Sequence, residues 1–367
     1  MKVEGKCRTT AMGIMPHTDV EKALELALSL DVPFWPQLPL ASFYEDMWVQ
    51  MSEGFPGITI DTEQKSVNFD SGRFQTDLYG YAQRIDRPEA FALSLKSSMT
   101  FHKFLKIKLD DHPAIRGQVI GPVNFGFRVV DENKKPIIYN EDVRSLLFDF
   151  IQRKVNVQYR ELVKKNGNAF VWLDEPGLGW VFNSFSGYTD IHAKEDYRHF
   201  LSGIEGPKAL HLCLNVNLHY LLGLGFDIIS MDAYQMDVMP KGYAGPVAAF
   251  IGAGGIISWG IVPTSADALE WETPDTLAGK LIGFWEVIAR NSGKSVRQIA
   301  EQAMIAPAKC CIKNVDKITT DDGLTKQNPN CCKVSDIEEI IVEKAFLYVR
   351  QISEILKAEF SFCSDTN

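Results

Sequence analysis

The sequence lacks any apolar run of the roughly 18 residues that a membrane-spanning helix needs, so no membrane segment is expected. Its opening stretch, MKVEGKCRTT, lacks the apolar core of a secretory signal, which predicts a cytoplasmic protein. Clusters of Lys and Arg are also missing, and the formal net charge is −9. Because phosphate backbones are bound through such clusters, nucleic acid is not an expected partner.

Cysteine is scarce, and its placement suits disulfides poorly. The seven cysteines are an odd number and include two adjacent pairs, Cys310-Cys311 and Cys331-Cys332. In a reducing compartment, such cysteines more often bind metal or take part in chemistry. The Cys331-Cys332 pair lies in a polar stretch, and no role is expected for it.

Short apolar runs alternate with helical patterns along the 367 residues. We expect strands at 9–15, 32–39, 117–127, 169–179, 208–215, 226–234, 254–264 and 303–311. We expect helices at 18–30, 156–167, 216–225, 275–293 and 335–360. Buried strands that alternate with helices indicate a parallel sheet. About eight such units predict an α/β fold, a single (β/α)8 TIM barrel over 1–367, and a doubly wound open sheet is the alternative.

Two segments interrupt this alternation, and we expect insertions near 44–110 and 313–334. Local residues predict the ends of several helices. Thr18 with Glu21 three positions later has the pattern of a capping box. Gly167 and Gly293 are expected to end their helices.

Polar side chains gather where the expected strands end, which is where barrels carry their active sites. They are Asp174, Glu175, His211, Cys213, Asp232, Cys310 and Cys311. His211 and Cys213 are two apart on one strand, so their side chains leave on the same face.

Imidazole, thiolate and carboxylate are the ligands that zinc takes. Because these ligands come from separate strands, they need the fold first, which is typical of a catalytic metal. We therefore predict a zinc site made of His211, Cys213, Asp232 and Cys310 or Cys311. The alternatives are that His211 is a structural histidine and that Cys310-Cys311 are small core residues.

Zinc bound by two thiolates lowers the pKa of an incoming thiol more effectively than it activates water. The expected chemistry is attack by a substrate thiolate on an activated carbon.

Two further motifs suggest substrate contacts. In LDEPGLG, Asp174 and Glu175 could bind a substrate ammonium or act as acid and base. The alternative is that Asp174 caps a helix and Glu175 is solvated. In AMGIMPHTD, backbone amides around Gly13 and Ile14 could hold a carboxylate, and His17 could contact an ion or cofactor or lie on the rim.

Several motifs together resemble a known superfamily. They are TAMGIMPHTD, PFWPQLP, GPVNFGF, WLDEPGLG, HLCLNVN, GFDIISMDAY, ISWGIVPT and APAKCC, spread over residues 9–312. These resemble the cobalamin-independent methionine synthase catalytic domains and the uroporphyrinogen decarboxylases, a superfamily that also includes corrinoid-dependent methyltransferases. The resemblance implies a (β/α)8 barrel.

In the methyltransferase branch, the resemblance implies zinc held by the HxC pair, an acidic residue one strand later and a cysteine after the last strand. Here those positions are His211, Cys213, Asp232 and Cys310 or Cys311. Two departures stand out. Asp232 replaces the usual Glu, and Lys309 is inserted before two cysteines.

The expected function is zinc-dependent methyl transfer to a thiol such as homocysteine. The methyl donor is expected to be methylcobalamin on a corrinoid protein or methyltetrahydrofolate. The sequence lacks the second barrel of full-length folate-dependent enzymes, which favours the corrinoid. The alternatives are a metal-independent decarboxylase of a polycarboxylate and a non-catalytic module that binds a corrinoid or a metal.

Overall fold

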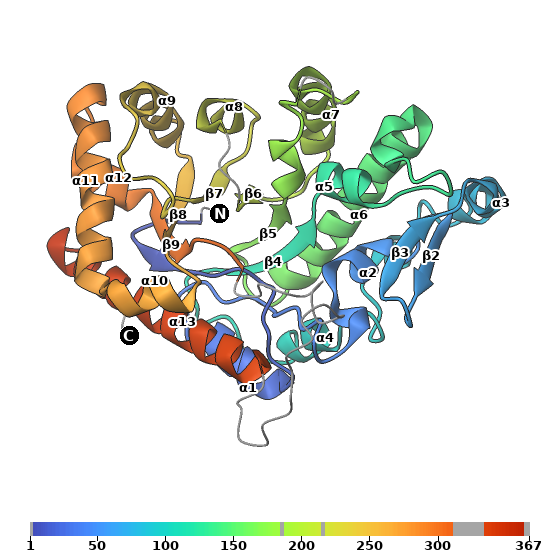
Figure 1. Cartoon of the computed structure of the whole chain (residues 1–367), viewed down its shortest axis with the longest axis horizontal. Coiled ribbons are helices and arrows are strands. Elements are labelled where there is room, and N and C mark those ends of the chain that lie inside the picture. The colour runs from blue at the N-terminus through green and yellow to red at the C-terminus, as the bar shows by residue number, and fades with distance from the viewer. Residues whose placement is uncertain (1–2, 184–186, 214–216, 311–333, 363–367) are drawn as a thin grey trace, which may run out of the picture.

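The main sheet consists of parallel strands that curl around an apolar interior (Figure 1). The computed structural model describes residues 3–183, 187–213, 217–310 and 334–362. Within them the sheet has seven strands in the order β1-β9-β8-β7-β6-β5-β4. The bounds are β1 (Arg8–Thr9), β4 (Ile115–Ile120), β5 (Ala169–Asp174), β6 (Lys208–Leu212), β7 (Ile228–Asp232), β8 (Ile256–Val262) and β9 (Ala303–Pro307).

The two edge strands of this sheet, β1 and β4, are joined by the segment 32–37. The backbone N–H of Val32 donates to the Thr9 carbonyl at 2.9 Å, on the β1 side. The N–H of Arg116 on β4 donates to the Pro33 carbonyl at 3.0 Å. Isolated parallel bridges mark the segment's pairing with Ile14 and with Arg116. The segment thus supplies hydrogen-bond partners to both edges, which would otherwise carry unpaired backbone groups.

Helices follow the strands and lie outside the sheet (Figure 1). They are α1 (Val20–Leu28), α5 (Pro122–Arg128), α6 (Glu141–Val163), α7 (Asp190–Ser202), α8 (Leu218–Leu222), α9 (Lys241–Gly252), α10 (Ala266–Trp271), α11 (Pro274–Ser292), α12 (Val296–Glu301) and α13 (Val334–Glu359), with short 3-10 turns η3 (Ile137–Tyr139) and η4 (Pro176–Gly179). None of the helices in the described ranges is long and apolar enough to cross a membrane.

Side chains alternate between the two faces of each strand, which gives two separate cores. On β4, Arg116 and Gln118 face inward, whereas Gly117 faces α6 so closely that a Cβ would clash with Gln158. Inward-facing residues such as Phe170, Trp172 and Met304 form the inner core. The outward-facing residues pack with the helices in the larger outer core.

The expected insertion at 44–110 contains its own small elements. They are η1 (Phe43–Glu45), α2 (Met47–Ser52), the antiparallel pair β2 (Ile58–Asp61) and β3 (Ser66–Phe69), α3 (Ser71–Ala82), η2 (Pro88–Phe91) and α4 (Met99–Phe104). The β2–β3 pair and α3 lie on the opposite side of the molecule from α9 and α11 (Figure 1). The other expected insertion, 313–334, lies almost wholly outside the described residues.

Several predicted boundaries were wrong for local reasons. The N-cap of α1 is Asp19 rather than Thr18, because the Asp19 carboxylate accepts from the N–H groups of Glu21 and Lys22. An ionised carboxylate caps a helix well because it also opposes the positive end of the helix dipole. The capping box expected from Thr18 and Glu21 is therefore not formed.

The strand expected at 117–127 ends at Ile120, and Pro122 begins α5. Proline suits the first helical position because its fixed φ is already helical and its missing N–H would have no partner there. The helix expected at 156–167 begins instead at Glu141 and ends before Gly167. The Gly293 end of α11 is confirmed, with a left-handed φ of 71°.

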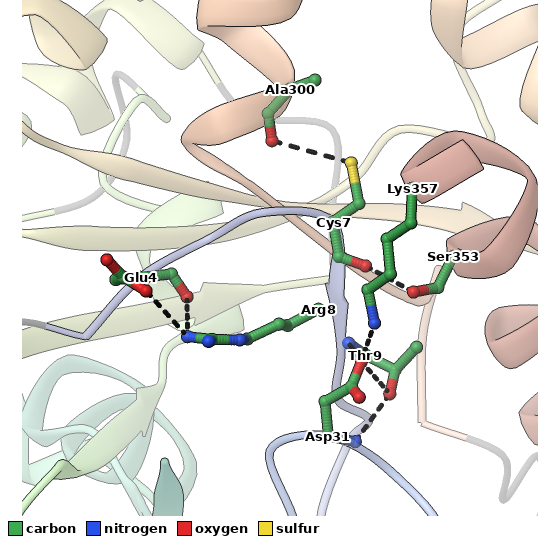
Figure 2. A network of polar contacts seen from close by, with 8 residues as sticks. All are labelled: Glu4, Cys7, Arg8, Thr9, Asp31, Ala300, Ser353 and Lys357. Atoms are coloured by element: carbon green, nitrogen blue, oxygen red, sulfur yellow. Dashed lines mark hydrogen bonds and ion pairs between the residues drawn. The ribbon is translucent and has the colours of Figure 1, made fainter. Parts of the chain in front are cut away.

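The last helix fastens the first strand in place, as Figure 2 shows. The hydroxyl of Ser353 on α13 donates to the Cys7 carbonyl at 2.7 Å. One turn later, the Lys357 ammonium lies 2.8 Å from the Asp31 carboxylate. That carboxylate also accepts from the backbone N–H of Thr9 at 2.9 Å. The two ends of the described chain are therefore held together by buried and half-buried polar contacts.

Candidate active site at the carboxyl ends of the strands

A small cavity of about 20 Å³ lies between the inward-facing residues of β4 and the carboxyl ends of β5 and β6. That volume suits a group of a few atoms, since one water needs roughly 10–15 Å³ by this measure. Its walls include six of the residues predicted from the sequence: Gly13, Ile14, Asp174, His211, Cys213 and Cys310. The remaining wall residues are Met12, Gln37, Met47, Arg116, Gln118 and Trp172.

His211 is held by one ring nitrogen. It lies on β6, and its Nδ1 is 3.0 Å from the hydroxyl oxygen of Ser230 on the neighbouring β7. Burial lowers the pKa of His211 to about 3, and the positive charge of Arg116 acts in the same direction. The imidazole is therefore neutral at physiological pH, and the Ser230 contact leaves Nε2 for another partner.

Cys213 follows the end of β6, and Cys310 follows β9. Burial raises the pKa of the Cys213 thiol, and the neighbouring Asp174 and Cys310 raise it further. A cation bound beside Cys213 would reverse this effect, because it stabilises the thiolate.

Asp174 ends β5 and lines the cavity. Burial raises its pKa to about 7, although Arg116 acts in the opposite direction. Its Oδ1 is buried without a hydrogen-bond partner among the described residues. Because such an atom is costly to leave unpaired, Asp174 can offer Oδ1 as an acceptor to a bound group.

Arg116 lines the same cavity, and sequence reasoning missed it. Its strand reads IRGQVI and every residue of it is buried. A charged residue in a buried strand is rare, and that alone could have singled it out.

Glu175 is engaged in holding a helix. Its carboxylate accepts from the N–H groups of Val123 at 2.8 Å and Asn124 at 2.7 Å, at the start of α5. The Tyr197 hydroxyl donates to it as well. Burial raises the pKa of Glu175 to about 8, and these hydrogen bonds act against that rise. The arrangement positions α5 beside β5.

Asp232 ends β7 and is engaged by two neighbours. Its carboxylate accepts from the side-chain amide of Gln235 at 2.5 Å and lies 3.5 Å from the Lys309 ammonium. Burial raises the pKa of Asp232, and both partners act against that rise. Because Lys309 directly precedes Cys310, this ion pair brings the ends of β7 and β9 together.

Gly13 is needed for a close approach rather than for flexibility. A Cβ at this position would lie 2.4 Å from the Cδ of Gln118. The Gly13 carbonyl accepts from the N–H of Gln37 at 2.7 Å, and Ile14 forms a bridge with the same residue.

His17 lies before α1 and is fully buried, and neither of its ring nitrogens hydrogen-bonds to a described residue. Burial lowers the pKa of His17.

A larger cavity of about 260 Å³ shares Ile14 and Met47 with the small one. Its walls also include Trp48, Lys65 and Arg128. The Arg128 guanidinium lies 6.0 Å from the centre of the Trp48 ring. The larger cavity gives a bulky ligand room beside the strand ends.

The donor types around the small cavity fit zinc, which binds imidazole nitrogen and thiolate sulfur. His211, Cys213 and Cys310 supply one nitrogen and two sulfurs. No three His, Cys, Asp or Glu side chains of the described ranges are grouped closely enough to hold a metal ion as they stand. Cys311, the other expected cysteine ligand, lies outside those ranges. The zinc site therefore stays a prediction. Three of its predicted donors, His211, Cys213 and Cys310, line the same cavity.

No protein-family model matches the sequence, and no curated protein matches it. Among solved structures, the chain is similar to a B12-independent methionine synthase from Shewanella sp. W3-18-1 in complex with selenomethionine, with a TM-score of 0.42 and 14% sequence identity. The alignment covers 68% of this chain and 64% of that chain, so this chain spans less than two thirds of its length. The roles of individual residues come from the geometry of this chain alone.

Proposed function

We propose that the chain is an eight-stranded (β/α)8-barrel enzyme that transfers a methyl group to a zinc-bound substrate thiol at the small cavity. The convergence of His211, Cys213 and Cys310 on one cavity carries this proposal. Asp232 or Cys311 would complete the ligand set. When bound, zinc supplies a positive charge that keeps the substrate sulfur as a thiolate at neutral pH.

The chain's own residues have supporting roles in this proposal. Ser230 holds Nδ1 of His211 and so fixes which ring nitrogen is left for the metal. Asp174, whose Oδ1 lacks a described partner, orients the acceptor. The acceptor is a small thiol such as homocysteine. The 260 Å³ cavity leaves room for part of the methyl donor, a corrinoid protein or methyltetrahydrofolate.

One observation favours a second candidate, a metal-independent decarboxylase of a polycarboxylate. The resemblance implies that members of that branch hold a polycarboxylate with several arginines and an aspartate at the mouth. The cavity is lined by both Arg116 and Asp174.

The deciding experiment measures zinc by elemental mass spectrometry in protein purified under reducing conditions. We expect one zinc ion per chain in the natural protein. The control variant Cys7→Ser should also bind one zinc ion, because the Cys7 thiol is buried against the Ala300 carbonyl and does not line the cavity. Cys213→Ser should lose the metal together with methyl transfer from methylcobalamin or methyltetrahydrofolate to thiols. A zinc-free protein that releases CO₂ from polycarboxylates would replace this proposal with the second candidate.

A further inference from the structure

Another cavity, of about 520 Å³, lies at the amino ends of the strands and is called the amino-end cavity below. The first residues of three strands line it, namely Ala169 of β5, Ile228 of β7 and Ile256 of β8. The candidate active site lies at the other end of these strands, and the six residues of β5 separate its two ends by about 17 Å. Pockets for small molecules measure roughly 300–1,000 Å³, so this cavity has room for a ligand of its own.

Part of the wall of the amino-end cavity is apolar and continuous with the interior of the sheet. Val3, Ile228 and Ile256 line it, are at most 5% exposed and belong to the inner core. These side chains can contact the hydrocarbon of a ligand, but they offer it no hydrogen bond.

The rim of the cavity carries a carboxylate in a fixed position. Oδ2 of Asp227 accepts from the backbone N–H of Lys208 at 2.9 Å, and the Asp227 N–H donates to the Lys208 carbonyl at 2.8 Å. The other carboxylate oxygen, Oδ1, has no hydrogen bond or ion pair with a described residue. Among the described residues of the wall, Asp227 alone is charged, so the cavity favours a cation.

The same wall contains two further side-chain oxygens, from Tyr159 and Asn168. The Tyr159 side chain packs on Gly206, where a Cβ would lie 2.7 Å from the hydroxyl oxygen. Because Gly206 precedes Lys208 by two residues, this hydroxyl and the Asp227 carboxylate flank the same short segment. Oδ1 of Asn168 is buried without a hydrogen-bond partner among the described residues. The polar part of the wall is therefore rich in acceptors.

We propose that the amino-end cavity binds a small organic cation, a primary ammonium group carried on a compact apolar body. The ammonium donates to Oδ1 of Asp227, and the Tyr159 hydroxyl accepts from another of its three N–H groups. The apolar body packs on Ile228 and Ile256. An anionic ligand would meet Asp227 without a cation among the described wall residues, and the formal net charge of −9 would repel it as well.

The test compares benzylamine with benzyl alcohol in titrations of the natural protein, followed by saturation-transfer difference NMR. The two probes have nearly the same shape, and only the amine is charged at neutral pH. We expect saturable binding of benzylamine, with benzyl alcohol weaker by roughly 3- to 10-fold, because Asp227 is exposed and water screens its charge. Equal affinities, or no saturable binding of benzylamine, would overturn the proposal.

One substitution assigns the preference for the amine to a single side chain. Asp227→Asn keeps an oxygen for the Lys208 N–H and removes the charge, so it should bind the two probes about equally. Asp70→Asn is the matched control, because Asp70 is also exposed and its carboxylate also accepts from a backbone N–H, that of Arg73 at 2.7 Å. The control should keep the preference for benzylamine, and a preference that persists in Asp227→Asn would refute the assignment.

A second substitution locates the ligand without changing Asp227. Ala253 lines the cavity and is exposed at the end of α9, with a helical φ of −79° that a larger side chain can adopt. In Ala253→Trp the indole should fill the cavity and abolish saturable binding of both probes. Unchanged binding in this variant would place the amine elsewhere and refute the proposal.

The outcome is separable from that of the proposed function. Cys213→Ser, which is expected to lose zinc and methyl transfer, should bind benzylamine as the natural protein does. If Cys213→Ser lost benzylamine binding, the amine would lie at the strand-end cavity and this inference would be wrong. A chain that never contains zinc but prefers benzylamine through Asp227 would refute the proposed methyl transfer and leave this inference intact.

Discussion

Replacing Gly13 by alanine tests how tightly the cavity wall is packed. The added Cβ would lie 2.4 Å from Cδ, 2.5 Å from Nε2 and 2.8 Å from Oε1 of Gln118. Gln118 cannot move aside without loss, because both ends of its amide are engaged. Its Nε2 donates to the Trp35 carbonyl at 2.6 Å, and its Oε1 accepts from Nη1 of Arg116 at 2.9 Å.

The expected loss of stability follows from these contacts. Overpacking in a tight interior costs about 1–3 kcal/mol. Displacing Gln118 also breaks a hydrogen bond from a charged group, which contributes about 1.5–3 kcal/mol. Gly13→Ala should therefore lower the free energy of unfolding by about 3–5 kcal/mol, a large fraction of what a typical domain has.

Urea unfolding followed by far-UV circular dichroism measures this difference, and a second substitution identifies its cause. Gln118→Ala removes the group that the new methyl group would strike, so the double variant should be more stable than the sum of the two single losses predicts by about 1–3 kcal/mol. Gly279→Ala on α11 is the control, since nothing lies within 4 Å of its added Cβ, and it should be neutral or stabilising. Strict additivity of the two cavity substitutions would refute the reasoning.

Three further predictions address charge and backbone. The pKa of His211 is lowered to about 3 in the folded chain, so the neutral imidazole contributes stability above pH 6.5 that is lost as the pH falls toward 3. Acid unfolding of the chelator-treated protein should show a loss of up to roughly 4–5 kcal/mol in the free energy of unfolding over this range. The variant His211→Asn should not show this loss. Glu175→Gln leaves one amide of the Val123–Asn124 pair poorly paired and should lower stability by about 1–3 kcal/mol in thermal unfolding, whereas an unchanged midpoint would contradict the capping role. Gly293→Ala forces a residue with a Cβ into φ 71° and should lower the free energy of unfolding in urea by about 1 kcal/mol, whereas Gly279→Ala should not lower it.

The parallel sheet could be predicted from the sequence because its strands are buried on both faces. Runs such as 254–264 are mostly apolar, with Ser258 as the polar residue within the strand. Long amphipathic patterns such as 335–360 leave little ambiguity about helices. The ends of elements were harder to place. Pro122 is compatible with both a strand exit and a helix start, and only the packing of α5 on Glu175 decides between them.

The site was predictable only in part, for a related reason. His211, Cys213 and Cys310 stand out because their residue types are uncommon at strand ends. Arg116 lies in the middle of a strand, where the alternation of faces determines whether it points into the sheet's interior. The two aromatic rings that hold it, from Phe34 and Trp172, come from distant parts of the chain, so their convergence was not visible in the sequence.

The pairing of the first strand has a consequence for how the chain folds during its synthesis. Arg8 on β1 pairs with Met304 on β9, and the carbonyl of Cys7 accepts a hydrogen bond from Ser353 on α13. A nascent chain emerging from the ribosome therefore carries β1 with one edge unmatched until β9 has been translated. Contacts so distant in sequence close slowly, and the exposed edge meanwhile is a site for mispairing. We therefore expect β1 to need protection from mispairing until β9 has emerged.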